Sequence, residues 1–284
     1  MLNVGLLGAG RIAGVHATTI TTNPGSRLAA VSDFIPENAE RLAAKYGSIV
    51  RTTDAIIADP SIDAVLIATS TDTHSDLIER ATAAGKSVLC EKPVDLSLAR
   101  AKACQATVAG TGKPVMIGFN RRFDPNFRPS RPRRSGARSE RPNSSITSFD
   151  PAPPPVAYIK VSGGMIHDFD MANFLMGAVP VTISAAASSI VDPEIGAAGD
   201  FDTVVVTLTY ADGRIAVNKN SRRAVCGYDQ RVEILGSGGL LQAQNLPDST
   251  FVRSTTAGVT GAKPTYFFLE RYMPSYAAEW AESV

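Results

Sequence analysis

The sequence contains few cysteines, and their pattern limits the kinds of site it can form. Its 284 residues include three cysteines, Cys90, Cys104 and Cys226, which are widely spaced and odd in number. This pattern does not fit a disulfide framework or a zinc site, so we expect reduced thiols and no metal. Cys90 lies in an apolar segment, which favours a buried structural thiol over a nucleophile.

The sequence also has little net charge and no long apolar run. The formal net charge of +1 gives no reason to expect nucleic acid or a membrane surface as a partner. No apolar run approaches the roughly 20 residues of a bilayer span, and we see no signal peptide at the N-terminus. We therefore expect a cytoplasmic protein, and its length suggests about two domains.

The first 120 residues alternate between short apolar segments and segments with helical spacing. Strands that alternate with helices at this spacing predict an α/β domain, in which helices cover both faces of a doubly wound parallel sheet. The expected strands span residues 2–7, 28–32, 63–69, 87–90 and 115–119, and the expected helices span residues 11–22, 36–46, 75–84 and 97–109.

Beyond Asp124 the character of the sequence changes. Residues 128–141 are rich in Arg, Pro and Ser without an apolar period, so we interpret them as a disordered or basic linker. A nucleic-acid site is a weaker alternative, because no aromatic residues are interleaved with the basic ones. The rest predicts an α+β domain over residues 121–284 with a largely antiparallel sheet. We expect a helix at 165–175, strands at 181–187, 203–210, 214–220 and 230–235, and a hairpin turn at Asp212-Gly213.

A glycine-rich turn joins the first expected strand to the first expected helix. Its sequence, Gly8-Ala9-Gly10-Arg11-Ile12-Ala13, has the G-x-G-x-x-A pattern of dinucleotide-binding domains. Gly8 permits the tight turn, Gly10 lets the backbone approach a pyrophosphate, and Ala13 allows close packing of the helix on the strand. The helix N-terminus supplies amide donors for the anion.

Asp33 follows the second expected strand, where an acidic residue binds the ribose hydroxyls of the adenosine. A carboxylate there repels a 2′-phosphate, so the sequence favours NAD over NADP. The alternative is an ordinary strand–turn–helix connection with a surface aspartate.

Three further segments carry residues that could act on a substrate. Glu91-Lys92-Pro93 follows the fourth expected strand, and a lysine there could favour deprotonation of a substrate hydroxyl. A solvated Glu–Lys pair is the alternative, and Pro93 could mark a cis bond. His74 is either a base or, as we favour, a residue that starts a helix. His167 is either the proton acceptor for alcohol oxidation or a structural histidine.

Together these motifs resemble the Gfo/Idh/MocA oxidoreductase family and, within it, the inositol 2-dehydrogenases. The matching segments cover most of the chain outside residues 128–149. The resemblance implies a Rossmann domain (1–120), an open-faced sheet domain (121–284), a homotetramer built through the sheets, and a role in inositol catabolism. The matching segments are GLLGAGRIAGVHA, the strand ending at Asp33, IATSTDTH, VLCEKPV, GFNRRFDP, DPAPPPVAYIKVSGG, MIHDFDMANFLMG and GYDQRVEILGSGG.

The resemblance also implies a reaction, the NAD-dependent oxidation of a polyol hydroxyl to a ketone. For myo-inositol the product is 2-keto-myo-inositol (scyllo-inosose). His167 would be the general base, and Lys92 would assist proton transfer and contact the substrate. The substrate would meet Lys92, Asn120, Arg121, His167 and Tyr228, and the cofactor would meet Gly8, Gly10, Arg11, Ile12, Asp33, Thr69, Ser70, His74, Glu91, Lys92 and Arg121.

Three features depart from the family pattern. The family has a catalytic aspartate four residues before the histidine, whereas here Gly163-Gly164 runs directly into Met165 and His167. This absence leaves an NAD-binding sensor without catalysis as an alternative function, beside a sugar oxidoreductase of the same family. Residues 128–149 have an anomalous composition. The chain also stops inside an apparent helix at residues 277–284, so we expect that it is truncated.

Overall fold

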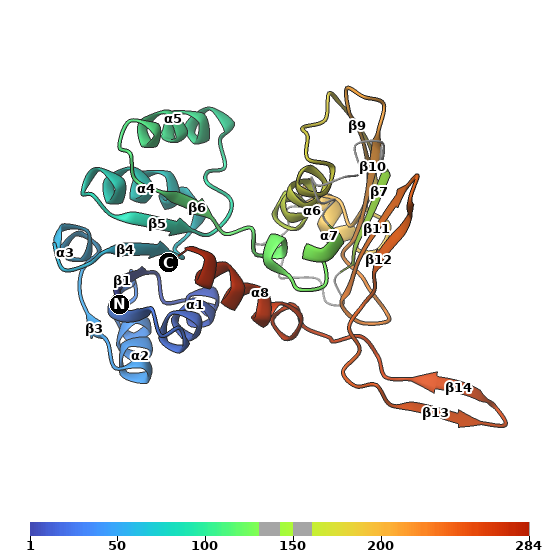
Figure 1. Cartoon of the computed structure of the whole chain (residues 1–284), viewed down its shortest axis with the longest axis horizontal. Coiled ribbons are helices and arrows are strands. Elements are labelled where there is room, and N and C mark those ends of the chain that lie inside the picture. Colours follow the sequence, from blue (N-terminus) through green and yellow to red (C-terminus); the bar gives the residue numbers. More distant parts are fainter. Residues whose placement is uncertain (131–142, 150–160, 284) are drawn as a thin grey trace. The chain divides into compact units, whose positions relative to one another are not determined.

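The computed structural model describes residues 1–130, 143–149 and 161–283, which fold as two units (Figure 1). The first unit contains Met1–Asn120 together with the residues from Ser275 onward, and the second contains Arg121–Pro274. The residues from Ser275 onward differ from the expectation, since they belong to the first unit.

A six-stranded parallel sheet forms the centre of the first unit, in the order β3-β2-β1-β4-β5-β6 (Figure 1). The predicted doubly wound α/β fold is thereby confirmed. The strand order reverses between β1 and β4, the place where ligands bind in open α/β sheets. The strands are β1 (Leu2–Leu7), β2 (Ser26–Ser32), β3 (Ile49–Val50), β4 (Ala64–Ile67), β5 (Ser87–Cys90) and β6 (Val115–Ile117), and the helices are α1 (Arg11–Thr22), α2 (Pro36–Tyr46), α3 (Thr53–Ala58), α4 (His74–Ala83) and α5 (Leu98–Ala109).

Both faces of this sheet are buried, because successive strand residues point to opposite sides. Leu6 and Leu66 belong to one apolar cluster, while their neighbours Leu7 and Ile67 belong to another. This double burial explains why the strands read as continuous apolar runs. Cys90 is fully buried, as predicted for a structural thiol, and burial raises the pKa of its sulfhydryl well above the usual value.

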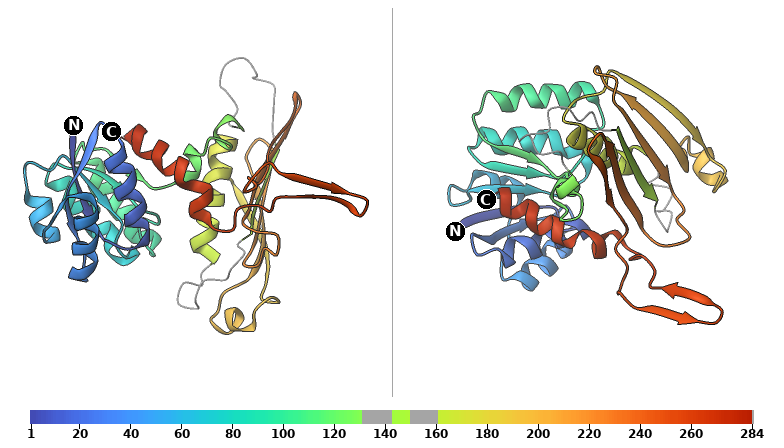
Figure 2. Two further views of the ribbon diagram at one scale, coloured as in Figure 1. Left: turned by 90° about the horizontal axis from the view of Figure 1, so that it is seen from below. Right: turned by 45° about the vertical axis from the view of Figure 1, so that its right-hand side comes forward.

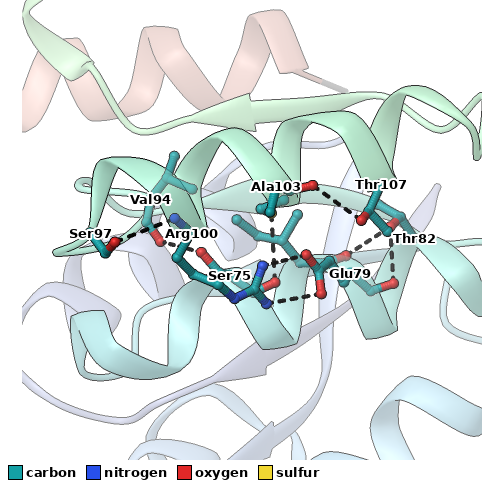
Figure 3. Close-up of polar contacts among 10 residues, drawn as sticks. Ser75, Glu79, Thr82, Val94, Ser97, Arg100, Ala103 and Thr107 are labelled. Atoms are coloured by element: carbon teal, nitrogen blue, oxygen red, sulfur yellow. Dashed lines mark hydrogen bonds and ion pairs between the residues drawn. The ribbon is translucent and has the colours of Figure 1, made fainter.

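Helices α4 and α5 lie side by side and are joined by side-chain bonds (Figure 3). The Arg100 guanidinium donates to both carboxylate oxygens of Glu79, at 2.5 and 2.9 Å. Ser75 Oγ, on α4, donates to the backbone oxygen of Val94 at 3.1 Å. The segment after β5 is therefore anchored to α4.

A second six-stranded sheet forms the second unit, in the order β12-β11-β7-β10-β9-β8 (Figure 2). Only β7 and β10 pair in parallel, which confirms the predicted, largely antiparallel α+β domain. Helix α6 (Val161–Met176) packs against β7 and β10. The strands are β7 (Asn143–Phe149), β8 (Thr182–Ser188), β9 (Thr203–Thr209), β10 (Ile215–Ser221), β11 (Asp229–Gly236) and β12 (Gly239–Ala243).

Strand β7 follows the expected linker at residues 128–141, in the segment of anomalous composition. The sequence predicts no strand here, but Asn143–Phe149 pairs with β10 on one side and with β11 on the other. The side chain of Ile146 is buried, but its neighbours at 143–145 and 147 are polar, so the segment lacks the apolar alternation of a strand. Backbone hydrogen bonds on both edges account for its place in the sheet. Residues 131–142 of the expected linker lie outside the described part.

Several smaller elements complete the chain. The predicted hairpin turn at Asp212-Gly213 is confirmed, with Gly213 at φ +84° and its N–H donating to the backbone oxygen of Tyr210. In the described residues, no helix has the length and apolar character needed to cross a membrane. The remaining elements are α7 (Pro193–Ala197), the hairpin β13 (Val252–Thr255) and β14 (Gly258–Gly261), and helix α8 (Phe268–Ser283).

Helix α8 passes from one unit to the other after Pro274. Its Trp280 is 3% exposed and belongs to the apolar cluster that contains Leu6 and Leu66. The indole Nε1 donates to Ser26 Oγ at 2.8 Å, so both the ring and its polar atom are accommodated. Burial of this side chain explains why the residues after Pro274 belong to the first unit.

Candidate functional site

The glycine turn after β1 requires a glycine at its first position. Gly8 has φ +94°, and a Cβ atom there would lie 2.4 Å from the backbone oxygen of Ala68. The turn therefore packs directly on the chain that leaves β4, at the point where the strand order reverses. A side chain at position 8 would push the two segments apart.

The N-terminus of α1 offers backbone donors to an anion. Gly10 is the residue before the helix, and no side chain caps the helix there. A Cβ atom on Gly10 would meet nothing within 4 Å, so the space beside this backbone is open to an approaching group. Since the first amides of a helix have no partner inside it, they suit a phosphate. Ala13 is fully buried against the sheet, which allows the helix to lie close to it.

Asp33 lies beside this turn at the end of β2. Its Oδ2 accepts a hydrogen bond from the backbone N–H of Ala9 at 2.5 Å, and its Oδ1 accepts one from Ile35 at 2.8 Å. These bonds hold the carboxylate at the mouth of the turn. A dinucleotide with its pyrophosphate on α1 would present its ribose hydroxyls to such a group. The glycine turn, the uncapped helix and Asp33 therefore fit NAD.

The turn after β5 carries a buried carboxylate and a half-buried lysine. Glu91 is buried, and its Oε1 accepts a hydrogen bond from His16 Nε2, on α1, at 2.7 Å. Burial alone would raise the pKa of Glu91. The bond and charge of His16, together with Lys92, outweigh burial and lower that pKa below its usual value. The bond from Lys92 to Pro93 is cis, as the sequence suggested.

His74 connects the ends of β4 and β5. It is the first residue of α4 and is buried, with Nδ1 2.7 Å from the backbone oxygen of Pro93 and Nε2 3.2 Å from that of Thr69. Both ring nitrogens thus face backbone carbonyls, which supports the favoured interpretation of a structural residue. Thr69 also bonds to Thr73 through their hydroxyls at 2.7 Å, while Ser70 is exposed. Contact of these residues with a cofactor stays a prediction.

In the second unit, His167 lies on α6 and is partly exposed. Gly163, at the position of the family's aspartate, lies one turn earlier on the same helix. The next carboxylate along, Asp168, is fully buried and accepts bonds from Arg121 Nη1 at 2.5 Å and from Asn220 Nδ2 at 2.7 Å. Asp168 therefore fixes α6 to β10 and to the turn that carries Arg121.

A second ion pair joins the same turn to α6. Arg122 donates to both oxygens of Asp170, at 2.8 and 2.5 Å. Burial raises the pKa of Asp170 even though Arg122 opposes the rise. Asp168 and Asp170 thus form ion pairs within the second unit, and neither stands where the family's aspartate would.

The remaining predicted substrate residues are buried. Tyr228 packs edge-on against Tyr272, with ring centroids 6.1 Å apart, and burial raises the pKa of Tyr272 to about 12. Asn120, in the first unit, donates through Nδ2 to Ser275 Oγ at 3.4 Å. Sequence reasoning missed His16 and Glu279, two further buried groups around Glu91. His16 had a signal, since it lies on the helix that the glycine turn opens, whereas Glu279 had none.

Within the described ranges, no three His, Cys, Asp or Glu side chains gather as metal ligands would. Lys92 belongs to the first unit, and Arg121, His167 and Tyr228 belong to the second.

Comparison with known proteins agrees with this geometry. Residues 2–119 match the model of an oxidoreductase family with an NAD-binding Rossmann fold, and residues 161–242 match the GFO/IDH/MocA C-terminal domain. The chain is 50% identical to the inositol 2-dehydrogenase of Rhizobium meliloti over 97% of its length and 85% of that protein. It is 41% identical to the myo-inositol 2-dehydrogenase of Thermotoga maritima, over 98% of this chain and 86% of that one.

A solved structure has the same fold. The myo-inositol dehydrogenase of Corynebacterium glutamicum superposes with a TM-score of 0.93 at 39% identity, covering 100% of this chain and 87% of that one. The parallel sheet, its glycine turn and the carboxylate at the end of β2 define an NAD-binding oxidoreductase. The chain belongs to the GFO/IDH/MocA oxidoreductase family.

Proposed function

We propose that this protein oxidises a cyclitol hydroxyl to a ketone with NAD, and that its substrate is myo-inositol, giving 2-keto-myo-inositol. The observation that carries the proposal is the 50% identity, over 97% of the chain, to an inositol 2-dehydrogenase. The Thermotoga maritima relative, with its similar name, supports the same substrate class.

We assign the proton chemistry to two residues. His167, partly exposed on α6, accepts the proton of the reacting hydroxyl. Lys92, after β5, stabilises the alkoxide that develops as this proton leaves. When bound, NAD would supply the hydride acceptor for the carbon that carries this hydroxyl. The bonds of His74 and Ser75 to the backbone of Pro93 and Val94 hold the Lys92 turn in place.

Binding is divided among several other residues. The backbone at Gly8, Gly10, Arg11 and Ile12 would hold the pyrophosphate, and Asp33 the ribose. The remaining proposed contacts to the cofactor are Thr69, Ser70, His74, Glu91, Lys92 and Arg121. Asn120, Arg121 and Tyr228 would supply polar partners to the substrate, because a buried hydroxyl without a partner costs free energy. The bond of Arg121 to Asp168 means that this guanidinium also supports α6.

Turnover by a lysine variant tests the proposed chemistry. Wild-type protein should form NADH from NAD and myo-inositol, whereas Lys92→Ala should lose at least about a hundredfold in kcat, the usual scale of proton-transfer assistance. NAD affinity, measured by calorimetry, should change much less. The matched control is Lys113→Ala, because Lys113 is exposed on the first unit. A wild-type protein that binds NAD but turns over no cyclitol would contradict the proposal.

We also propose that the chain forms a homotetramer through the second sheet. The face of this sheet opposite its buried residues exposes Val205 (41%), Ile215 (42%), Leu235 (56%) and Leu240 (49%). An apolar face of this kind supports burial against another copy of the chain. Val205→Glu should reduce the mass measured by light scattering, whereas Val225→Glu, at a 96% exposed valine outside the strands, should not. A wild-type monomer would contradict this part.

The cytoplasm is the compartment we propose, with inositol catabolism as the role. Cys90, Cys104 and Cys226 are free thiols, which suits a reducing compartment. Growth on myo-inositol as sole carbon source, compared before and after deletion of the gene, tests the role.

A further inference from the structure

A buried acidic side chain in the first unit takes no part in the functions described so far. Glu279, on α8, is 0% exposed. In the part of the chain that the structure describes, neither of its carboxyl oxygens has a hydrogen-bond partner. An ionised carboxylate in this position would have lost its water without gaining a bond or a cation, which is the costliest state for a buried acid.

Glu279 lies close enough to Glu91 for the two charges to repel each other. Glu91 has the better environment for a negative charge, because His16 Nε2 donates to it at 2.7 Å and Lys92 follows it directly. His16 is in turn fixed by the ring of Tyr276, whose centroid lies 5.5 Å from that of the imidazole, at 85° to it. Glu91 is the titratable group whose charge acts on Glu279, and His16 of α1 links Glu91 to Tyr276 of α8.

Only one of the two carboxyl groups can be ionised without a large penalty. The Glu91 carboxylate accepts a hydrogen bond from His16 and the buried Glu279 carboxyl has no partner, so the negative charge is favoured on Glu91 and disfavoured on Glu279. Burial, followed by repulsion from Glu91, raises the pKa of Glu279 well above its usual value. The pKa of Glu91 is shifted in the opposite direction, below its usual value.

We propose that Glu279 is a positioning residue that carries a proton and thereby leaves Glu91 as the single negative charge beside Lys92. This charge keeps Lys92 in the ammonium form that stabilises a developing alkoxide. The catalytic half of the inference rests on the proposed function, because it assumes that Lys92 assists the reaction. The protonation of Glu279 does not depend on the substrate.

Folding stability tests the proton on Glu279 without any activity measurement. A carboxyl whose pKa is raised by folding binds its proton in the native state at pH values where the unfolded chain has lost it. Stability is therefore retained below the unfolded pKa of about 4.5 and is lost as the pH rises from there towards the native pKa. The unfolding equilibrium constant should rise by up to tenfold per pH unit over this window because of Glu279.

The experiment compares Glu279→Gln with the wild type in chemical unfolding between pH 4 and pH 8. Glutamine has the same shape and cannot ionise, so the variant should gain stability relative to the wild type as the pH rises. Glu282→Gln, at an exposed glutamate of the same helix, should show a pH-independent difference from the wild type. A pH-independent difference for Glu279→Gln as well would overturn the proposal.

The alkaline limb of the pH dependence of kcat/KM tests whether the charge of Glu91 acts on Lys92. Glu91→Gln removes the negative charge beside the lysine, so this limb should move by about one unit to lower pH. Glu279→Gln removes no charge if Glu279 is protonated. The alkaline limb of kcat/KM for this variant should therefore coincide with that of the wild type. A downward shift in both variants would show that Glu279 is ionised, and no shift in Glu91→Gln would show that the cluster is merely structural.

Two further comparisons distinguish a failure of this proposal from a failure of the proposed function. If Glu91→Gln does not fold, the alkaline limb of Glu279→Gln is compared with that of the wild type alone, and a downward shift would overturn the proposal. If no cyclitol is turned over, the proposed function fails, yet the stability profile of Glu279→Gln still decides whether this residue holds a proton.

Discussion

At the scale of single residues, the nucleotide site depends on backbone shape more than on side chains. Gly8 combines a positive φ with a contact so close that a Cβ atom would overlap the backbone oxygen of Ala68. Gly10 and Gly14 lie on the same turn and helix, but a Cβ atom on either would meet nothing within 4 Å. Gly8 therefore has a steric reason to be glycine that Gly10 and Gly14 lack.

Substitution of Gly8 by alanine should lower both stability and NAD affinity. The positive φ alone costs about 1–2 kcal/mol for a residue with a Cβ atom, and relief of the overlap would move the turn away from the cofactor. Calorimetric titration with NAD should show at least a tenfold weaker Kd. Gly14→Ala is the control and should be stabilised by about 0.5–1 kcal/mol, because alanine favours the helix. Equal effects in both variants would contradict this explanation.

How much of the site could be predicted from sequence differs from residue to residue. Gly8, Gly10 and Asp33 follow predicted strands, so their meeting at one edge of the sheet could be inferred from topology alone. The partners of buried charges could not be inferred. Arg121 is separated from Asp168 by 47 positions, and no local pattern signals their bond.

At the scale of elements, helix α6 is positioned by ion pairs with two arginines that lie much earlier in the chain. Arg121 and Arg122 are neighbours in sequence and bind Asp168 and Asp170, yet their environments differ. The side chain of Arg121 is 7% exposed and that of Asp168 is 0% exposed, whereas the side chain of Arg122 is 42% exposed. Since α6 carries His167, these pairs fix the proposed base.

The two arginines should therefore respond unequally to the same substitution. Arg121→Met would remove the guanidinium that pairs with the fully buried Asp168 carboxylate, which should cost about 3–5 kcal/mol in the free energy of unfolding. Arg122→Met removes a guanidinium that water already reaches, so its cost should be nearer to about 1 kcal/mol. Urea unfolding of both variants measures the difference. Similar losses in both variants would mean that burial does not determine how much each ion pair contributes to the free energy of unfolding.

Elements with a strong apolar period could be predicted, and those held by their neighbours could not. Helices α1 and α2 begin and end at the expected residues, because the glycine turn, Pro36 and Gly47 mark their ends. Strand β7 has few apolar residues and is specified by the strands on both sides of it. Strand β3 has only two residues, and both are exposed, so no period could reveal it.

At the scale of the whole molecule, the first unit is built from two distant parts of the chain. Trp280 fills a place in the core formed by β1, β2 and β4, and its indole bonds to Ser26. The sequence before residue 120 gives no sign that this core needs an outside residue. The expected boundary accordingly left the residues after Pro274 in the second domain.

Removal of this side chain should destabilise the nucleotide-binding unit. Trp280→Ala creates a large cavity and leaves Ser26 without its donor, so we expect a loss of about 3–5 kcal/mol. Saturating NAD should recover part of the loss, because the ligand binds only the folded state. Thermal unfolding with and without NAD measures both effects. Phe251→Ala, at a side chain that is 71% exposed, should leave Tm nearly unchanged. A comparable drop in both variants would argue against the role of Trp280.

The position of Trp280 also sets an order of events during synthesis. The six strands of the first sheet leave the ribosome early, but their core lacks one of its side chains until α8 has been made. All of the second unit is translated in between, which takes on the order of 10 s at ribosomal rates. During this interval the nascent chain holds a parallel sheet with an uncovered apolar site, and that site is where we expect a chaperone to bind while translation continues.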